Sequence, residues 1–240
     1  MVNPKKEIRV YLEKLVKQYL FITGINNQLK IMREWEWPNR IEALNEGSYF
    51  FRLVSFSFTR TLLIELAKFI SAKEDKSLID FLEKAKMFSK SILPTKHNSK
   101  NEKRDPITSE DFVKIIDSQL NKIQEYDKVI KHIKVRRDNA FAHTASKYFN
   151  NPNKIYEHYP ISLSDIDNLM LLITDILRTH HSYLLNSDID LEVKSTGNVD
   201  NVLINNRAFK RVWRDRRIIN CGIKPSRYKL DDYKNDNEFE

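Results

Sequence analysis

The residues best suited to chemistry lie in one short segment near the middle of the chain, where residues 136–143 read RRDNAFAH. Two adjacent arginines, Arg136 and Arg137, precede His143 in this segment. An imidazole titrates near neutral pH and is therefore suited to proton transfer. The planar guanidinium of arginine is suited to stabilising negative charge on a phosphate group. The segment therefore predicts acid–base chemistry beside an anion such as phosphate.

The place of Arg137 in the helical pattern is unusual. Isoleucines recur every seven residues before it, at Ile116, Ile123 and Ile130, and Arg137 occupies the next position of this seam. A guanidinium on a buried seam is costly unless it has a partner or lines a pocket. A plainer interpretation also stands, in which the arginine reaches water from the edge of the helix and the histidine is satisfied in the core.

Five stretches have the apolar spacing of three and four residues that predicts helices. They lie between Pro4 and Pro38, from about Ile41 to Ile70, from Ser77 to Ala85, from Thr108 to Ile133, and from Ser162 or Ser164 to Leu184. The second is apolar on several faces, so we expect a central, largely buried helix. Residues 94–106 are almost free of apolar side chains and predict a solvated loop. The pattern as a whole predicts an all-α bundle of four to five long helices.

The amino-acid composition excludes several classes of protein function. The chain has 240 residues but only four glycines, too few for the glycine-rich phosphate loops of Rossmann, P-loop or kinase proteins. A single cysteine, Cys221, cannot form an intramolecular disulfide or a thiolate zinc site, and we expect a cytoplasmic protein. The first residues lack the apolar run of a signal peptide, and no stretch is long and apolar enough to span a membrane.

The positive charge of the chain is concentrated near its end. The formal net charge is +8, and residues 207–229 hold nine basic residues against one acid. We expect residues 1–187 to form the helical bundle and residues 188–240 to form a basic, partly irregular appendage, in which 189–193 alternate like a short strand. Basic side chains interleaved with aromatic ones suit contact with a nucleic-acid backbone. The candidate RNA contacts in this tail are Arg211, Arg214 and Arg217, although a solvated arm or one docked on the acidic last residues fits the pattern equally well.

The segment around Arg137 and the helices around it resemble the HEPN superfamily, and more closely its abortive-infection branch of the U type, the AbiU2-like proteins. In that family a long helix bears an arginine, a polar residue and then a histidine, here Arg137, Asp138 and His143. The aromatic-rich second helix with its following loop, and a last helix opened by the Ser/Asp cluster at 161–165, are also similar. The resemblance covers about residues 5–186.

The resemblance implies a metal-independent endoribonuclease that acts in phage defence or as a toxin. The 2′-hydroxyl of the RNA would attack the adjacent phosphate, and the products would end in a 2′,3′-cyclic phosphate and a 5′-hydroxyl. The site would lie at the interface of a homodimer, without a cofactor or a metal ion. RNA, a second copy of the chain, and a cognate antitoxin or other defence protein would be the partners, and no membrane would be involved.

The family's catalytic pair maps onto Arg137 and His143, with Arg136, Asp138 and Asn139 in supporting roles. The choice of arginine stays open at this stage. Asp138 and the seam favour Arg137, whereas residues seven apart share a helix face, which pairs Arg136 with His143. Lys147 and Tyr148 follow closely and are candidate contacts to phosphate or base.

Two other functions remain open. The first is a HEPN-type protein that binds RNA or a nucleotide without cleaving it. The second is a helical interaction module that recruits a partner through its basic tail. The remaining histidines give no ligand pattern: His180 and His181 lie beside an apolar stripe, and His97, His132 and His158 stand alone.

Overall fold

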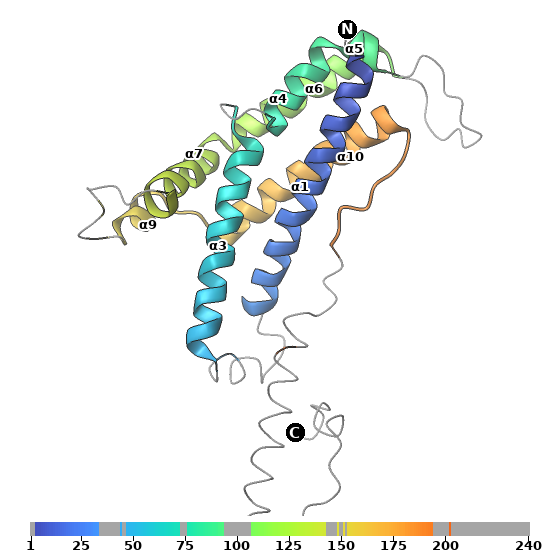
Figure 1. Ribbon diagram of the computed structural model, residues 1–240. Helices are drawn as coiled ribbons and strands as arrows, with labels where there is room; N and C mark the ends of the chain where they lie inside the picture. The colour runs from blue at the N-terminus through green and yellow to red at the C-terminus, as the bar shows by residue number, and fades with distance from the viewer. Residues whose placement is uncertain are drawn as a thin grey trace, which may run out of the picture. The chain divides into compact units, whose positions relative to one another are not determined.

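The computed structural model describes residues 3–33, 44, 47–72, 76–93, 107–142, 148, 151, 153–193 and 202, and the side chains of 140–142 are outside that description. The elements that follow one another along these residues are all helical (Figure 1). They are α1 (Pro4–Arg33), α3 (Ser48–Ile70), α4 (Leu78–Met87), α5 (Ser89–Ile92), α6 (Ser109–Glu125), α7 (Asp127–Arg136), the π-helical turn η1 (Arg137–Ala142), α9 (Lys154–His158) and α10 (Leu163–Leu185). The predicted all-α fold is confirmed.

Local capping fixes where three of these helices begin. The side chains of Ser77, Thr108 and Ser162 each accept a hydrogen bond from the main-chain N–H three residues on, and so precede α4, α6 and α10. Ser162 and Asp165 form a complete capping box, because the carboxylate of Asp165 also accepts a hydrogen bond from the main-chain N–H of Ser162 at 2.8 Å. Such caps satisfy donors that have no partner inside the helix. The starts predicted at Ser77 and Thr108 are confirmed, and of the two candidates Ser162 and Ser164 the structure selects Ser162.

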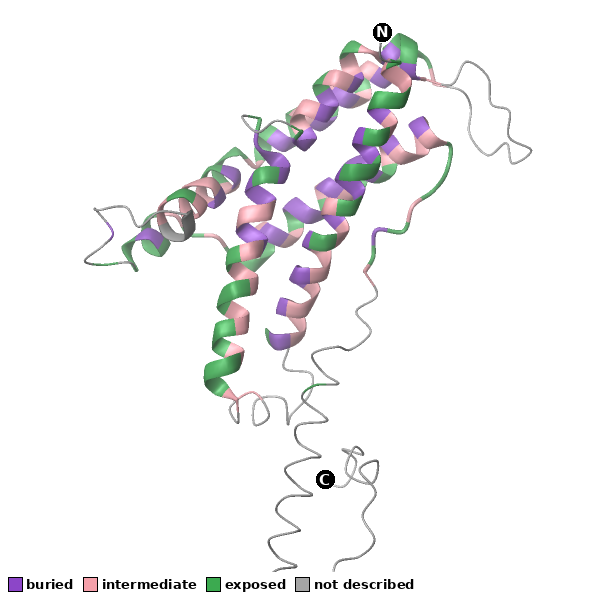
Figure 2. Ribbon diagram, viewed as in Figure 1, coloured by how far each residue is buried: buried purple, intermediate pink, exposed green. Residues whose placement is uncertain are grey.

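The chain divides into two compact units. The first comprises residues 1–25 and 60–193, and the second comprises residues 26–59 and 194–240. The core of the first unit is made by one buried stripe from each long helix, drawn in purple in Figure 2. Its members include Leu12, Leu15 and Ile22 of α1, Leu66 and Phe69 of α3, Phe81 of α4, Phe112 and Ile116 of α6, and Leu169, Ile173 and Leu177 of α10.

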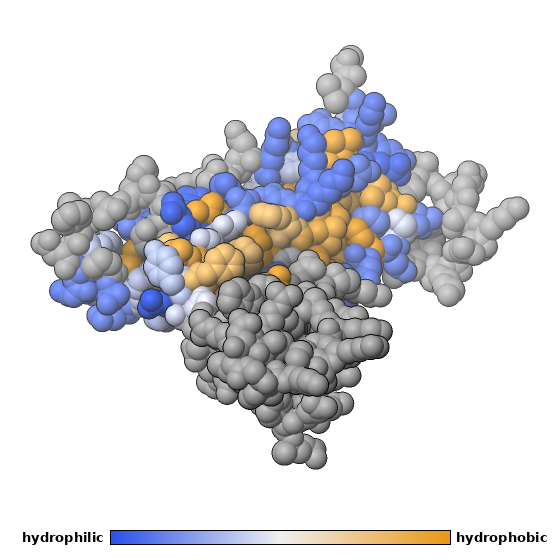
Figure 3. All heavy atoms as spheres, turned by 60° about the horizontal axis from the view of Figure 1, so that its bottom comes forward, coloured by the Kyte–Doolittle hydropathy of each residue, from blue (hydrophilic) through white to orange (hydrophobic). Residues whose placement is uncertain are grey.

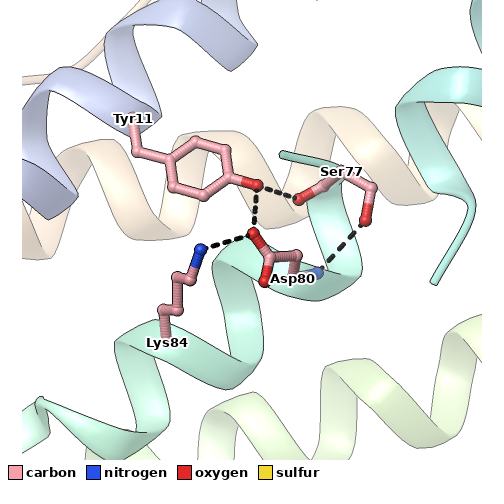
Figure 4. Close-up of polar contacts among 4 residues, drawn as sticks. All are labelled: Tyr11, Ser77, Asp80 and Lys84. Atoms are coloured by element: carbon pink, nitrogen blue, oxygen red, sulfur yellow. Dashed lines mark hydrogen bonds and ion pairs between the residues drawn. The ribbon is translucent and has the colours of Figure 1, made fainter. Parts of the chain in front are cut away.

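Two tyrosines of α1 tie this core together with polar bonds. The hydroxyl of Tyr19 donates to the carbonyl oxygen of Met170 at 2.6 Å and thereby joins α1 to α10. The hydroxyl of Tyr11 lies 2.9 Å from the carbonyl oxygen of Ser77 and 2.8 Å from Oδ2 of Asp80, at the start of α4 (Figure 4). Burial alone would raise the pKa of Asp80, but hydrogen bonds from Lys84 and Tyr11 lower it below its usual value.

Three predictions of the sequence need correction. The helix expected from Thr108 onward is two helices, because Tyr126 leaves helical geometry with φ −94° and ψ 7° between α6 and α7. Residues 188–193 form no strand, since no neighbouring strand among the described residues offers hydrogen bonds, and they pack instead through the buried side chain of Leu191. The second helix is buried only in its later half (Figure 2).

The exposed half of α3 lies in the second unit. Its apolar side chains at 49, 50, 53 and 56 are all exposed, and Tyr49 reaches 70%. Figure 3 shows hydrophobic side chains at the molecular surface. Apolar residues on several faces predict burial only if neighbours cover every face, and a periodicity argument does not supply those neighbours.

Other predictions about organisation lie outside the described residues. They concern the loop 94–106, the start of the second helix at 41–43 and most of the tail. The first unit extends through residue 193, and the predicted division into a bundle at 1–187 and an appendage at 188–240 stays a prediction.

His180 is the one histidine buried in the core among the described residues. Its Nε2 donates to Oε1 of Gln119 at 2.8 Å, and its ring meets Phe81 and Phe112 edge to face at 5.2 Å and 5.3 Å. Nδ1 is buried without a hydrogen-bond partner. Protonation would place a charge and an unpaired donor among aromatic rings, and burial therefore lowers the pKa of His180 to about 3.

We predict that this histidine makes the fold acid-sensitive. The pKa of His180 falls on folding, so the unfolded chain binds more protons between its ordinary pKa of 6.5 and about 3, and stability is lost as the pH falls through that window. The slope from this group is at most about 1.4 kcal/mol per pH unit. Urea unfolding at a series of pH values measures it.

The double variant His180→Leu with Gln119→Leu removes the titrating group together with the amide that it would leave unpaired. Its stability should depend less steeply on pH in the same window. Leu177→Ala, a core change on the same helix, should keep the wild-type slope. Parallel slopes in all three proteins would refute the assignment.

Candidate active site at the end of helix α7

The helix that carries the arginine pair is anchored by its own apolar side. Ile130 and Ile133 of α7 are 5% and 0% exposed, and Ile116 and Ile123 of α6 are equally buried. The predicted seam of isoleucines is confirmed. Because these buried isoleucines anchor α7 to the core, they also fix the position of the residues at its C-terminal end.

At Arg137 the helix changes from α to π geometry, and the π turn continues to Ala142. The side-chain amide of Asn139 donates to the carbonyl oxygen of Val135 at 2.9 Å. In an α-helix that carbonyl would receive the main-chain N–H of Asn139 itself. The side chain therefore competes with the helical ladder where the wider turn begins. Single π turns within helices occur often at functional sites.

Arg137 is the first residue of this π turn. Its side chain is 20% exposed, and its Nε donates to Oδ1 of Asp138 at 2.7 Å. Asp138 is itself exposed, so the ion pair adds only about 0–1 kcal/mol to stability. Its effect is to orient the guanidinium of Arg137. An arginine at a buried seam position needs a partner for its charge, and Asp138 provides one for the mostly covered Arg137.

Arg136 points to different partners. Its Nε donates to the carbonyl oxygen of Tyr159 at 2.8 Å, Nη2 lies 3.5 Å from that of Tyr156, and Cζ lies 4.9 Å from the centre of the Tyr156 ring. Burial lowers the pKa of Arg136, and the nearby Tyr156 partly opposes this shift. The side chain therefore links α7 to α9 and to the chain that follows it.

His132 supports the same linker from one helical turn earlier. Its Nδ1 lies 2.7 Å from the carbonyl oxygen of Pro160, and its ring meets Tyr159 edge to face at 5.5 Å. His158 lies beside the same tyrosine at 6.5 Å. His132 and His158 stand alone in the sequence pattern. His132 and Arg136 are four residues apart and therefore lie on one helix face. This spacing is the sequence feature that could have indicated that both side chains contact the same segment.

The structure brings Arg137 and Asp138 together and gives the other described site residues different partners. Asp138 pairs with Arg137, Asn139 bonds to its own helix, and Arg136 faces α9. Tyr148 is 5% exposed, with its ring 6.4 Å from that of His158. His143, Lys147, Arg211, Arg214 and Arg217 lie outside the described residues. The roles assigned to all of these residues stay predictions.

The described residues offer neither a metal site nor a membrane span. In the part of the chain that the structure describes, no three His, Cys, Asp or Glu side chains are grouped so that they could hold a metal ion. None of the described helices is long and apolar enough to cross a membrane.

The contacts of Arg136 predict a specific local effect. Arg136→Gln should lower the free energy of unfolding by about 1 kcal/mol, because a charged donor to main-chain carbonyls is lost. Amide hydrogen exchange in α9 should accelerate more than exchange in α4. Lys131→Gln removes the same charge from an exposed position of α7 and should change neither quantity. Equal exchange in α9 in both variants would show that Arg136 does not hold this helix.

Comparison with known proteins places the chain in a family. It matches none of the curated proteins and none of the solved structures with which it was compared. The family model described as AbiU2, of the HEPN type, matches residues 6–205, which include all the described helices except the first two residues of α1. The matched region contains the complete arginine–histidine segment at the end of α7. The chain therefore belongs to the AbiU2 family of HEPN proteins.

Proposed function

We propose that this protein is a metal-independent endoribonuclease of the HEPN type that acts in phage defence, by abortive infection or as a toxin. Membership of the AbiU2 family supports a HEPN domain. The observation that carries the proposal is the orientation of Arg137 by Asp138 at the start of the π turn that leads toward His143.

The geometry favours Arg137 over Arg136 as the working arginine. Arg136 uses Nε on a main-chain carbonyl and lies against the Tyr156 ring, so turning it toward a substrate would release α9. Nε of Arg137 donates instead to the exposed carboxylate of Asp138, its neighbour in sequence, so that this bond does not hold α9. The π turn also changes the register after Arg137, which weakens the α-helical argument for pairing Arg136 with His143.

The chemistry follows from these groups. His143 moves the proton of the attacking 2′-hydroxyl or of the leaving 5′-oxygen. Arg137 stabilises the charge that develops on the phosphate, and Asp138 keeps its guanidinium oriented. Basic residues of the tail, with Lys147, add contacts to the RNA backbone. An antitoxin or another defence protein is a candidate regulator.

Arg137→Ala and His143→Ala should each reduce RNA cleavage by about 100-fold or more, in line with the loss of one group that stabilises or protonates the transition state. Cleavage by the wild type should survive EDTA and leave cyclic phosphate ends. The measurement is gel analysis of a labelled RNA with end-group mapping. Lys131→Gln, which removes a cation from the exposed side of α7, is the matched control.

The outcomes separate the alternatives. RNA binding without any cleavage would identify a non-catalytic HEPN protein. Biological activity that survives His143→Ala but is lost when residues 190–240 are deleted would identify an interaction module. Loss of cleavage in EDTA with recovery on adding one divalent ion would overturn the mechanism.

We further propose that two protomers share the site. A two-fold axis repeats one surface on both partners and would bring two copies of Arg137 and His143 to one cleft. That arrangement would supply an acid as well as a base. Arg137→Ala and His143→Ala proteins, each inactive alone, should then recover part of the activity when co-expressed as mixed dimers. Mixed dimers that form but stay inactive would argue against a site built from both chains.

A further inference from the structure

A hollow in the second unit has the composition of a phosphate site and shares no residue with the arginine–histidine segment. It lies between the end of α1 and the first turns of α3, with a volume of about 460 Å³. Its lining residues are Met32, Arg33, Leu44, Ser48, Phe51, Arg52 and Ser55. All seven belong to residues 26–59.

The polar side of the hollow is made by one face of α3. Ser48, Arg52 and Ser55 follow at intervals of four and three residues, which places them on the same helix face. Arg33 enters from α1, where its Nη2 donates to Oγ1 of Thr59 at 3.3 Å. No carboxylate among the described residues pairs with Arg33 or Arg52. Two cations with hydroxyl donors nearby match the charge and hydrogen-bonding needs of a phosphate group.

The other side of the hollow is apolar. Met32 is buried, and the ring of Phe51 lies edge to face with that of Phe50, with the ring centres 5.2 Å apart. Gly47 leaves room for that ring, because a Cβ there would lie 3.1 Å from it. A flat apolar group beside a phosphate would therefore find both an aromatic surface and a pair of cations.

We propose that this hollow binds a nucleoside monophosphate unit, with the phosphate on Arg33 and Arg52 and the base against Phe51 and Met32. The unit is either a free nucleotide or one residue of a single-stranded RNA, since both present the same chemistry. This binding does not depend on cleavage at Arg137.

Equilibrium binding to the full chain tests the site. The probes are inorganic phosphate, adenosine, AMP, and an oligoadenylate with 2′-O-methyl riboses, which lacks the attacking hydroxyl. AMP should bind more tightly than phosphate or adenosine. Arg33→Gln and Arg52→Gln should each weaken AMP binding by about tenfold, as expected for loss of a charge-assisted hydrogen bond. Phe51→Leu should weaken AMP binding and leave phosphate binding unchanged.

Lys122→Gln, an equal charge change at an exposed position of α6, should leave AMP binding unchanged. Tighter binding of the oligoadenylate than of AMP, with the same dependence on Arg52, would assign the site to an RNA strand; equal or weaker binding would assign it to a free nucleotide. AMP that fails to saturate the protein, or that binds both arginine variants as tightly as the wild type, would overturn the proposal. Cleavage is not the readout, so this result is independent of the proposed ribonuclease.

Discussion

The carbonyl groups of Tyr159 and Pro160 lie in the linker between α9 and α10, where neither helix can supply their hydrogen-bond donors. Side chains of α7 supply them instead, Arg136 to Tyr159 and His132 to Pro160. Because these donors stand one turn apart on a helix anchored by buried isoleucines, the linker is fixed to α7 at two successive residues. The arginine–histidine segment therefore begins at the end of α7 where this linker is bound.

Because of this constraint, Arg136 and Arg137 have different partners. A guanidinium that donates to main-chain carbonyls and lies over the ring of Tyr156 is part of the scaffold. The next residue, Arg137, donates through Nε to the exposed carboxylate of Asp138, and the chain changes to π geometry at that point. Adjacent residues of the same type thus face different surroundings, since successive side chains on a helix point about 100° apart.

The core combines apolar packing with a few buried hydrogen bonds between helices. Tyr19 joins α1 to α10, Tyr11 joins α1 to the start of α4, and His180 joins α10 to Gln119 of α6. Each bond satisfies a polar group that would be costly to bury alone. Nδ1 of His180 is left without a partner, and burial lowers the pKa of the imidazole and keeps it neutral. These bonds fix which helices meet, a choice that apolar stripes alone leave open.

The sequence by itself determined the local features of this protein. Ser77, Thr108 and Ser162 marked helix starts because a cap depends on residues three positions apart, and the isoleucine seam marked the buried side of α6 and α7. The segment around Arg137, taken together with the pattern of helices around it, was enough to indicate the family. Tertiary structure decided the rest. The exposed first half of α3 and the contact of His132 with Tyr159 both depend on which distant residues cover a surface or supply a donor. Such partners are set by packing of the whole chain, and local spacing carries no record of them.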